Sequence, residues 1–462
     1  MTDVSEPLRL NPDRAEPWGM RLWLLTAIVI LVSTMVQTYG ISKWPMADDE
    51  VLSLVTMGLA KVDADLFAFP ADHHVKLPRA VPVWHAIQRQ ALRLFPHGEA
   101  GYRIPSVICG ILFSALVFLV AARWRDLWFA AALAILINGN QLFVHVAQVN
   151  RFYSMPLLFL ALAVAAMWFP RGGMATIVMT GVLALLTVLS HNATVPFFGL
   201  AFVASCATSV LRLTPWTLLV RSGTAFAVST SVYLFYLMPL IRGWYTTGNP
   251  TPVLVSFSAY LGIPTVALGC LGAWLIVSRR TRREQSLWWL LVASGTLCLF
   301  VVSTFSWNPR YFVFFLPAFW MLAAEAMAVV ARRFDYGLTG AIWYGCIIVL
   351  LLPNLFSHFA DGSRHDYRSA AAVVIQKAQP TEQVLSDDAE TIAYYLPDEF
   401  RGRLLMRTKI REPPLEAFLL VARSNAWMQL PRYGNRRVEV LAEIFHRRVD
   451  QFSHVLRVYR VH

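Results

Sequence analysis

The chain has 462 residues, of which 57% are hydrophobic and only 15% are charged, and its mean hydropathy is +0.51. Soluble globular chains have about 45–50% apolar and about 25% charged residues, so this composition excludes a purely water-soluble protein. The formal net charge is +12. In so apolar a chain we assign this basic balance to cytoplasmic anchoring charges and to anionic lipid substrates, and we predict no nucleic-acid partner.

The apolar residues are concentrated in about eleven runs, each close to the roughly 20 residues that cross a bilayer. The first run follows Arg21; it is too long for a signal-peptide core, so we expect a retained anchor helix. Within the runs the only charged residue is Glu325, which we expect to be a structural acid paired with an arginine. All five cysteines fall in the runs, which predicts neither a disulfide framework nor a thiolate metal site. The runs cover residues 22–40, 104–122, 127–144, 155–170, 174–190, 194–211, 222–241, 255–278, 286–306, 311–331 and 338–357.

Arginine is unevenly distributed between the connections of these runs. If the N-terminus is cytoplasmic, the short outer loops carry little more than Arg151, Arg242 and Arg310. This bias satisfies the positive-inside rule and places residues 41–103, and everything after residue 357, outside. The inner segments then carry Arg9, Arg14, Arg21, Arg123, Arg125, Arg171, Arg212, Arg221, Arg279, Arg280, Arg282, Arg283, Arg332 and Arg333.

Two hydrophilic segments lie on the outer side. In the outer loop 41–103, Ala80–Phe95 has the pattern of an amphipathic helix lying in the interface plane, with Ile87 on its apolar side and Gln88 on its polar side. The tail 358–462 alternates between helix and strand patterns and predicts a small α/β domain. We therefore expect an all-α polytopic membrane domain, 1–357, followed by an extracytoplasmic α/β domain, 358–462. The expected helices of the tail are 366–379, 391–396 and 438–448, and its strands are 383–386, 417–422 and 455–461.

An acidic cluster, Asp48-Asp49-Glu50, follows the first run by about eight residues. Inverting glycosyl transfer needs one carboxylate, which takes the proton of the acceptor hydroxyl as that oxygen attacks the anomeric carbon. Acids at the start of a helix can also be merely solvated, because helix N-termini favour negative charge. From position alone the two interpretations carry equal weight.

Further polar groups map to the same outer side. His73, His74, Lys76 and Arg79 could hold a phosphate leaving group, or could form a polar interfacial loop. Adjacent histidines rarely point at one ion, so we do not favour a metal site or a required divalent metal. Arg151 suits a phosphate or a lipid headgroup anchor. The remaining candidates on this side are Tyr153; His191, which alone would more often be structural; and Arg310 with Tyr311.

Several motifs together resemble the bacterial polyprenyl-phosphate-sugar-dependent glycosyltransferases of the GT-C fold, which include the protein O-mannosyltransferases and the lipid A aminoarabinose transferase. An Asp-Glu pair opening a helix is matched by Asp49-Glu50. Where many members have Gln-Glu-Ala-Arg-x-Tyr, the chain has Gln148 to Tyr153, with Val149 in place of the acid. The other matching segments are His73–Pro78, Leu94–Gly98, Arg103–Ser106, Ser190-His191, Arg310-Tyr311, Leu316-Pro317 and Asp366–Ala371.

The resemblance implies an inverting transferase of the bacterial inner membrane that uses a polyprenyl-phosphate sugar as donor and a glycan, lipid or protein as acceptor. Asp49 inherits the role of general base, with Asp48 and Glu50 as the neighbouring acids. The donor phosphate would be held by Lys76, Arg151 and Arg310. Tyr153 and His74 would assist there, and His73, His191 and Tyr311 would contact substrate.

Two other functions stay open. A transporter or flippase of lipid-linked sugars would place charged groups within the spans, where this chain has only Glu325. A non-catalytic protein with the same fold is also compatible with the loss of the acid at Val149.

Overall fold

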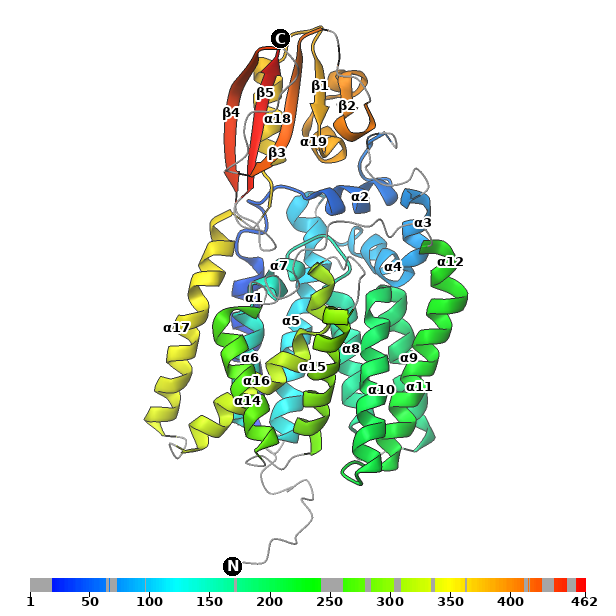
Figure 1. The fold of residues 1–462 in the computed structure, drawn as a ribbon, viewed down its shortest axis with the longest axis vertical. Coiled ribbons are helices and arrows are strands. Elements are labelled where there is room, and N and C mark those ends of the chain that lie inside the picture. Colours follow the sequence, from blue (N-terminus) through cyan, green and yellow to red (C-terminus); the bar gives the residue numbers. More distant parts are fainter. Residues whose placement is uncertain are drawn as a thin grey trace, which may run out of the picture.

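The computed structural model describes residues 19–63, 66, 73–95, 97–169, 173–241, 261–278, 284–302, 309–333, 337–361, 364–410, 414, 416–425, 436–446 and 454–462. Helices form a bundle along the long axis of the molecule, and a small β-sheet lies beyond one end of it (Figure 1). We call this the sheet end of the bundle; it contains the end of α1 (Met20–Thr38) and the start of α5 (Glu99–Trp124). Three short helices lie between the bundle and the sheet: α2 (Asp48–Thr56), α3 (His73–Ala80) and α4 (Pro82–Ala91) (Figure 1).

The bundle is built from apolar helices that follow the predicted runs. Five of the described helices are long and apolar enough to cross a membrane, or six if the bent pair α6 and α7 forms one span, and four more are apolar but shorter. Helix α5 contacts α1, α6 and α8 and so runs through the centre of the bundle. The bundle helices are α1 (Met20–Thr38), α5 (Glu99–Trp124), α6 (Leu127–Asn138), α7 (Gln141–Ala147), α8 (Ser154–Met167), α9 (Met174–Ser190), α10 (Val195–Val210), α11 (Trp216–Val232), α12 (Met238–Ile241), α14 (Ile263–Val277), α15 (Glu284–Val302), α16 (Leu316–Arg333) and α17 (Leu338–Asp361).

The run 127–144 differs from its prediction, because it is broken into α6 and α7 with a bend of 67°. The Asn140 side chain accepts a hydrogen bond from the amide of Phe143 at 2.9 Å and so begins a new helix there. The bend turns the end of the run away from the bundle axis. It thereby brings the polar segment after α7 to the sheet end.

Near the opposite end, Arg125 forms a buried ion pair with Glu325. Ser286 lies beside the pair and accepts a hydrogen bond from Arg125 at 3.0 Å. The prediction that Glu325 is a structural acid paired with an arginine is confirmed. A charge in the apolar interior is tolerated here because its partner is equally buried.

The tail folds into a five-stranded sheet of order β2-β1-β3-β5-β4. β1 pairs in parallel with β2 and β3, whereas β5 pairs antiparallel with β3 and β4. Helices α18 and α19 cover one face and bury Val384, Leu419 and Val458 beneath them. The elements are α18 (Tyr367–Lys377), β1 (Gln383–Ser386), α19 (Ala389–Tyr395), β2 (Leu404–Met406), β3 (Phe418–Asn425), β4 (Val438–His446) and β5 (His454–Val461).

One element of the tail was assigned to the wrong class. The helix expected over 438–448 is strand β4, which pairs along its length with β5. A register shift between Val440 and Ala442 interrupts its alternation. An extra residue in a strand moves the following side chains to the other face, which hides the period of two in the sequence. The other predicted elements of the tail are found within a few residues of their expected bounds.

Candidate active site at the sheet end of the bundle

The acidic cluster begins helix α2 (Asp48–Thr56). Asp48 and Asp49 occupy its first turn, and their side chains lie outside the described residues. Glu50 folds back to the start of the helix and accepts a hydrogen bond from the amide of Ala47 at 3.0 Å. Both the capping contact and the helix dipole favour acids at this place.

Glu50 is completely buried between two arginines. Arg103 of α5 donates to both of its carboxylate oxygens, at 2.9 and 3.1 Å, and Arg364 donates to one of them at 2.8 Å. The amide of Asn150 donates to the other at 2.6 Å. Burial alone would raise the pKa of Glu50, but the two guanidinium charges and these hydrogen bonds outweigh it and hold the pKa at about 2.

This placement separates the three acids of the predicted cluster. Glu50 has both oxygens occupied and no exposed surface, so it fixes α2 rather than meeting a substrate. Asp48 and Asp49 precede it on the same turn and remain the candidates for the base.

Arg151 lies directly beneath α2. Its guanidinium donates to the hydroxyl of Ser53 at 3.2 Å and lies over the ring of Phe152, 4.4 Å from its centroid. Its carbonyl accepts a hydrogen bond from Ser106 of α5 at 2.8 Å. The side chain is buried, so this positive charge sits in a medium where it acts more strongly on an anion than it would in water.

Helix α4 (Pro82–Ala91) presents polar groups to the same site. The amide of Gln88 donates to the side-chain oxygen of Asn150 at 2.8 Å. His85 is buried, and burial together with the charges of Arg151 and Arg89 lowers its pKa to about 4. Near neutral pH this ring is therefore uncharged beside the arginine.

The helical prediction for this segment holds, but Gln88 does not lie on the face expected for it. Gln88, expected on the polar outer side, is fully buried, whereas the expected apolar Ile87 is 39% exposed. Hydrogen-bond partners at the site determine which face of the helix is buried. A pattern of hydrophobic residues carries no information about such partners.

An aromatic group closes the inner side of the site. His191, between α9 and η2 (Asn192–Thr194), lies 4.8 Å from Phe152 and 5.6 Å from Tyr153 between ring centroids. Phe314, at the end of η4 (Pro309–Phe314), lies 4.9 Å from His191. The structure thus brings together Arg151, Tyr153, His191 and the turn that contains Arg310.

Other predicted residues are placed less completely. Arg310 and Tyr311 form part of η4, but their side chains lie outside the described residues, as do those of His73 and His74. Lys76 is half-buried on α3 (His73–Ala80), which packs against α2 and α4. In the described part of the chain, no three His, Cys, Asp or Glu residues are arranged to hold a metal ion.

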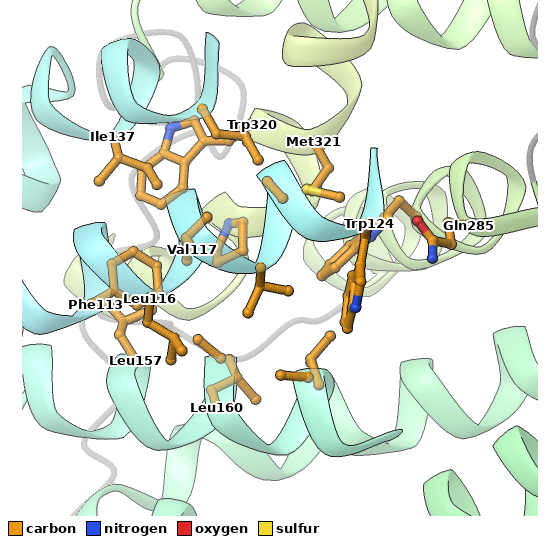
Figure 2. Close-up of a pocket in the computed structure, with 18 of the residues that line it drawn as sticks. Phe113, Leu116, Val117, Trp124, Ile137, Leu157, Leu160, Gln285, Trp320 and Met321 are labelled. Atoms are coloured by element: carbon orange, nitrogen blue, oxygen red, sulfur yellow. The ribbon is translucent and has the colours of Figure 1, made fainter. Parts of the chain in front are cut away.

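An apolar cavity of about 70 Å³ lies within the bundle below this group. Leu157 and Leu160 line it from α8, about one and two helical turns beyond Tyr153. Phe113 of α5 and Trp320 of α16 face it from other sides (Figure 2). The cavity extends along α5 from Phe113 to Arg125, and its lining is almost entirely apolar.

Three contributors to the site were not predicted. His85 and Gln88 were hidden because they lie in a helix whose pattern suggested a simple interfacial face. Arg364 lies 314 residues from its partner Glu50, and no local motif connects two residues at that separation. The nearest segment that matched the family motifs is Asp366–Ala371, and that match did not include Arg364.

No protein-family profile and no curated protein sequence matches the chain. Among solved structures, ArnT from Cupriavidus metallidurans bound to undecaprenyl phosphate has a TM-score of 0.57 at 15% identity, over 95% of this chain and 98% of that one. An Archaeoglobus fulgidus oligosaccharyltransferase tethered with an acceptor peptide has a TM-score of 0.51 at 13% identity, over 84% of this chain and 64% of that one. At such identities the likeness establishes the fold. The predicted resemblance is confirmed at that level: the chain has the fold of the GT-C glycosyltransferases.

Proposed function

We propose that this protein is a membrane glycosyltransferase that moves a sugar from a polyprenyl-phosphate donor to a hydroxyl acceptor on a glycan, lipid or protein. The observation that carries the proposal is the placement of buried Arg151 beneath the helix that begins with Asp48 and Asp49. The proposed cation for the phosphate and the helix that carries the proposed base thus lie at one end of the bundle. Two solved structures with a similar fold support the proposal. ArnT is bound to undecaprenyl phosphate, and the oligosaccharyltransferase is tethered with an acceptor peptide.

In the proposed reaction, Asp49 takes the proton of the acceptor hydroxyl while that oxygen attacks the anomeric carbon. The bond from this carbon to the phosphate oxygen breaks, and polyprenyl phosphate leaves with the electron pair. The configuration at the anomeric carbon is inverted, because attack and departure occur on opposite faces of the sugar. Asp48 is the alternative base.

The leaving phosphate carries negative charge, which a preorganised cation stabilises as the bond breaks. We assign this role to Arg151, Lys76 and Arg310, and we propose that Tyr153 and His74 assist them. The neutral His85 does not add charge near pH 7, so the positive charge at the phosphate comes from the arginines and the lysine. His73, His191 and Tyr311 are the proposed contacts to the rest of the substrate.

We further propose that the sheet end faces the outer side of the bacterial inner membrane. The uneven distribution of arginines supports a cytoplasmic N-terminus. About eleven spans would then form the membrane domain, 1–357, and residues 358–462 would lie in the periplasm. Helix α17 reaches Asp361 and would lead directly into that domain.

The test is turnover by the purified full-length chain in lipid nanodiscs. Synthetic polyprenyl-phosphate sugars are incubated with extracted glycolipids, envelope glycans and proteins, and both released polyprenyl phosphate and labelled acceptor are quantified. Turnover that is lost in Asp49→Asn supports the proposal, and a parallel sample with a chelator tests for a required metal. Donor that crosses the bilayer of proteoliposomes with its sugar intact would instead establish a flippase. Donor binding without either reaction would establish a non-catalytic protein.

A further inference from the structure

Arg364 connects the first residues of the C-terminal domain, 358–462, to the candidate site. It lies between α17 and α18, is buried, and donates to Glu50 at 2.8 Å. The same guanidinium donates to the carbonyl of Pro45 at 3.1 Å and to that of Gln148 at 2.9 Å. One side chain therefore ties together the segment before α2, helix α2 itself and the turn that leads to Arg151.

A second contact from the C-terminal domain lies on the other side of α2. The hydroxyl of Tyr395, on α19, accepts a hydrogen bond from the amide of Met46 at 2.5 Å and donates to Glu99 at 3.0 Å. Its ring packs against an apolar group that includes Val51 and Leu54 of α2. Burial, followed by the nearby charge of Glu99, raises the pKa of Tyr395, so the hydroxyl stays protonated and able to donate.

The bundle holds α2 from the opposite direction. Arg103 of α5 binds Glu50, and Arg151 binds Ser53. The position of α2 is therefore set jointly by the bundle and by the C-terminal domain. Removing Arg103 or Arg364 would leave the buried carboxylate of Glu50 with only one of its two counter-charges. Such a loss is costly in the interior of a protein.

We propose that the C-terminal domain positions α2 through Arg364, and hence the acids at the start of this helix. Arg364 does not touch substrate in this scheme; it acts through Glu50 as a positioning residue. The inference concerns the role of the domain in the reaction and rests on the function proposed above. The orientation of α2 itself can nevertheless be measured without any substrate.

The first experiment is amide hydrogen exchange of the full-length chain in nanodiscs. In Arg364→Gln we expect the amides of residues 48–56 to exchange about tenfold faster, with α8 and α9 unchanged, because only the local opening of α2 becomes easier. Arg364→Lys keeps a charge but not the three-way contact and should lie between. The matched control is Arg457→Gln, which removes a positive charge from the same domain, where it pairs with Glu443 at 2.9 Å. Unchanged exchange of α2, or acceleration throughout the chain, would overturn the proposal.

The second experiment compares turnover with binding. Arg364→Gln should lower kcat at least about tenfold while the affinity for polyprenyl phosphate falls less, because the acids move with α2, whereas Arg151 is also held by the hydrogen bond from Ser106 to its carbonyl. The double variant Glu50→Gln/Arg364→Gln should be no slower than Glu50→Gln, since both act through one contact. If the losses of kcat in the two single variants multiplied in the double variant, or if Arg364→Gln lowered only the affinity for polyprenyl phosphate, Arg364 would not act by positioning α2 through Glu50. If the unaltered protein turns over no donor, the proposed function fails, while hydrogen exchange still decides the role of Arg364.

The pH profile gives a third readout that general destabilisation would not produce. With Arg364 removed, burial still favours the neutral form of Glu50, and Arg103 and the amide of Asn150 oppose it without the second positive charge. The pKa of Glu50 then rises, so Arg364→Gln should lose activity as the pH falls through a range in which the unaltered protein keeps it. This difference should disappear in the double variant with Glu50→Gln. A shift that persists there would place the titrating group elsewhere.

Discussion

Arg103 donates hydrogen bonds to both carboxylate oxygens of Glu50, at 2.9 and 3.1 Å, and neither side chain is exposed to solvent. The same guanidinium donates to the carbonyls of Ile41, Trp44 and Pro45 at 2.7–2.9 Å. The planar fork of arginine can make all these contacts at once, which lysine cannot. The pair thus joins helix α5 to the whole segment between α1 and α2.

Glu50→Gln should lower the free energy of unfolding at pH 7 by about 3–5 kcal/mol, because two buried arginines lose their counter-charge. The pKa of Glu50 is held at about 2, below its ordinary 4.5, so its stabilisation is present above pH 4.5 and is lost as the pH falls toward 2. The difference between the two proteins should therefore shrink on acidification. Thermal unfolding in nanodiscs at several pH values measures it. Glu443→Gln, at an exposed pair, should change stability by less than about 1 kcal/mol.

Asp49→Asn should lower kcat by about 10²-fold or more, because a general base contributes about 10²–10⁴-fold and asparagine cannot accept the proton. Donor binding and the thermal midpoint should stay unchanged. Asp48→Asn is the matched control: it removes an equal charge from the same helical turn and should keep its activity. Reversed results would make Asp48 the base, and full activity in both variants would exclude this cluster from catalysis.

Arg151→Gln should weaken the binding of polyprenyl phosphate by about tenfold or more, since a hydrogen bond to a charged group contributes about 1.5–3 kcal/mol. Equilibrium binding with a fluorescent polyprenyl phosphate measures this. Arg93→Gln removes the same charge from an exposed position and should bind normally. Ser53→Ala removes the hydrogen bond between Arg151 and Ser53 of α2 but keeps the cation. An equal loss in Ser53→Ala would mean that Arg151 supports α2 rather than the phosphate.

The sequence predicted elements well wherever the pattern was local and continuous. The apolar runs became bundle helices, and strand β1 begins and ends at the expected residues, Gln383 and Ser386. Strand β4 was mistaken for a helix for a physical reason. Across the register shift near Val440, apolar residues stand at Val438, Leu441, Ala442 and Phe445. Apolar residues on one face of a helix have the same spacing, so the pattern indicated a helix.

The site was predictable only in part, because its contacts span very different sequence distances. Arg151 and His191 were found because each interrupts or ends an apolar run, where a polar residue stands out. The pairing of Glu50 with Arg364 joins residues that are 314 positions apart, and no local sequence pattern indicates it. Gln88 was placed on the wrong face of its helix, because a buried amide partner overrides hydrophobicity.

Close packing of α14 against α16 should depend on Gly272. A Cβ at this position would overlap with the backbone carbonyl of Leu322, which cannot move aside as a flexible side chain would. Small residues allow such close approach of helices in a bilayer, where no hydrophobic effect drives association. Gly272→Ala should therefore destabilise the protein by about 1–3 kcal/mol.

Gly269 lies one helical turn earlier in α14 and provides the matched control. A Cβ there meets no atom within 4 Å, so Gly269→Ala adds the same methyl group without a clash. Alanine is also the better helix former by about 1 kcal/mol, so this variant should be neutral or slightly stabilised. Thermal unfolding of both variants in nanodiscs compares them. Equal midpoints would mean that α14 and α16 separate at little cost, and the tight contact at Leu322 would then not stabilise the bundle.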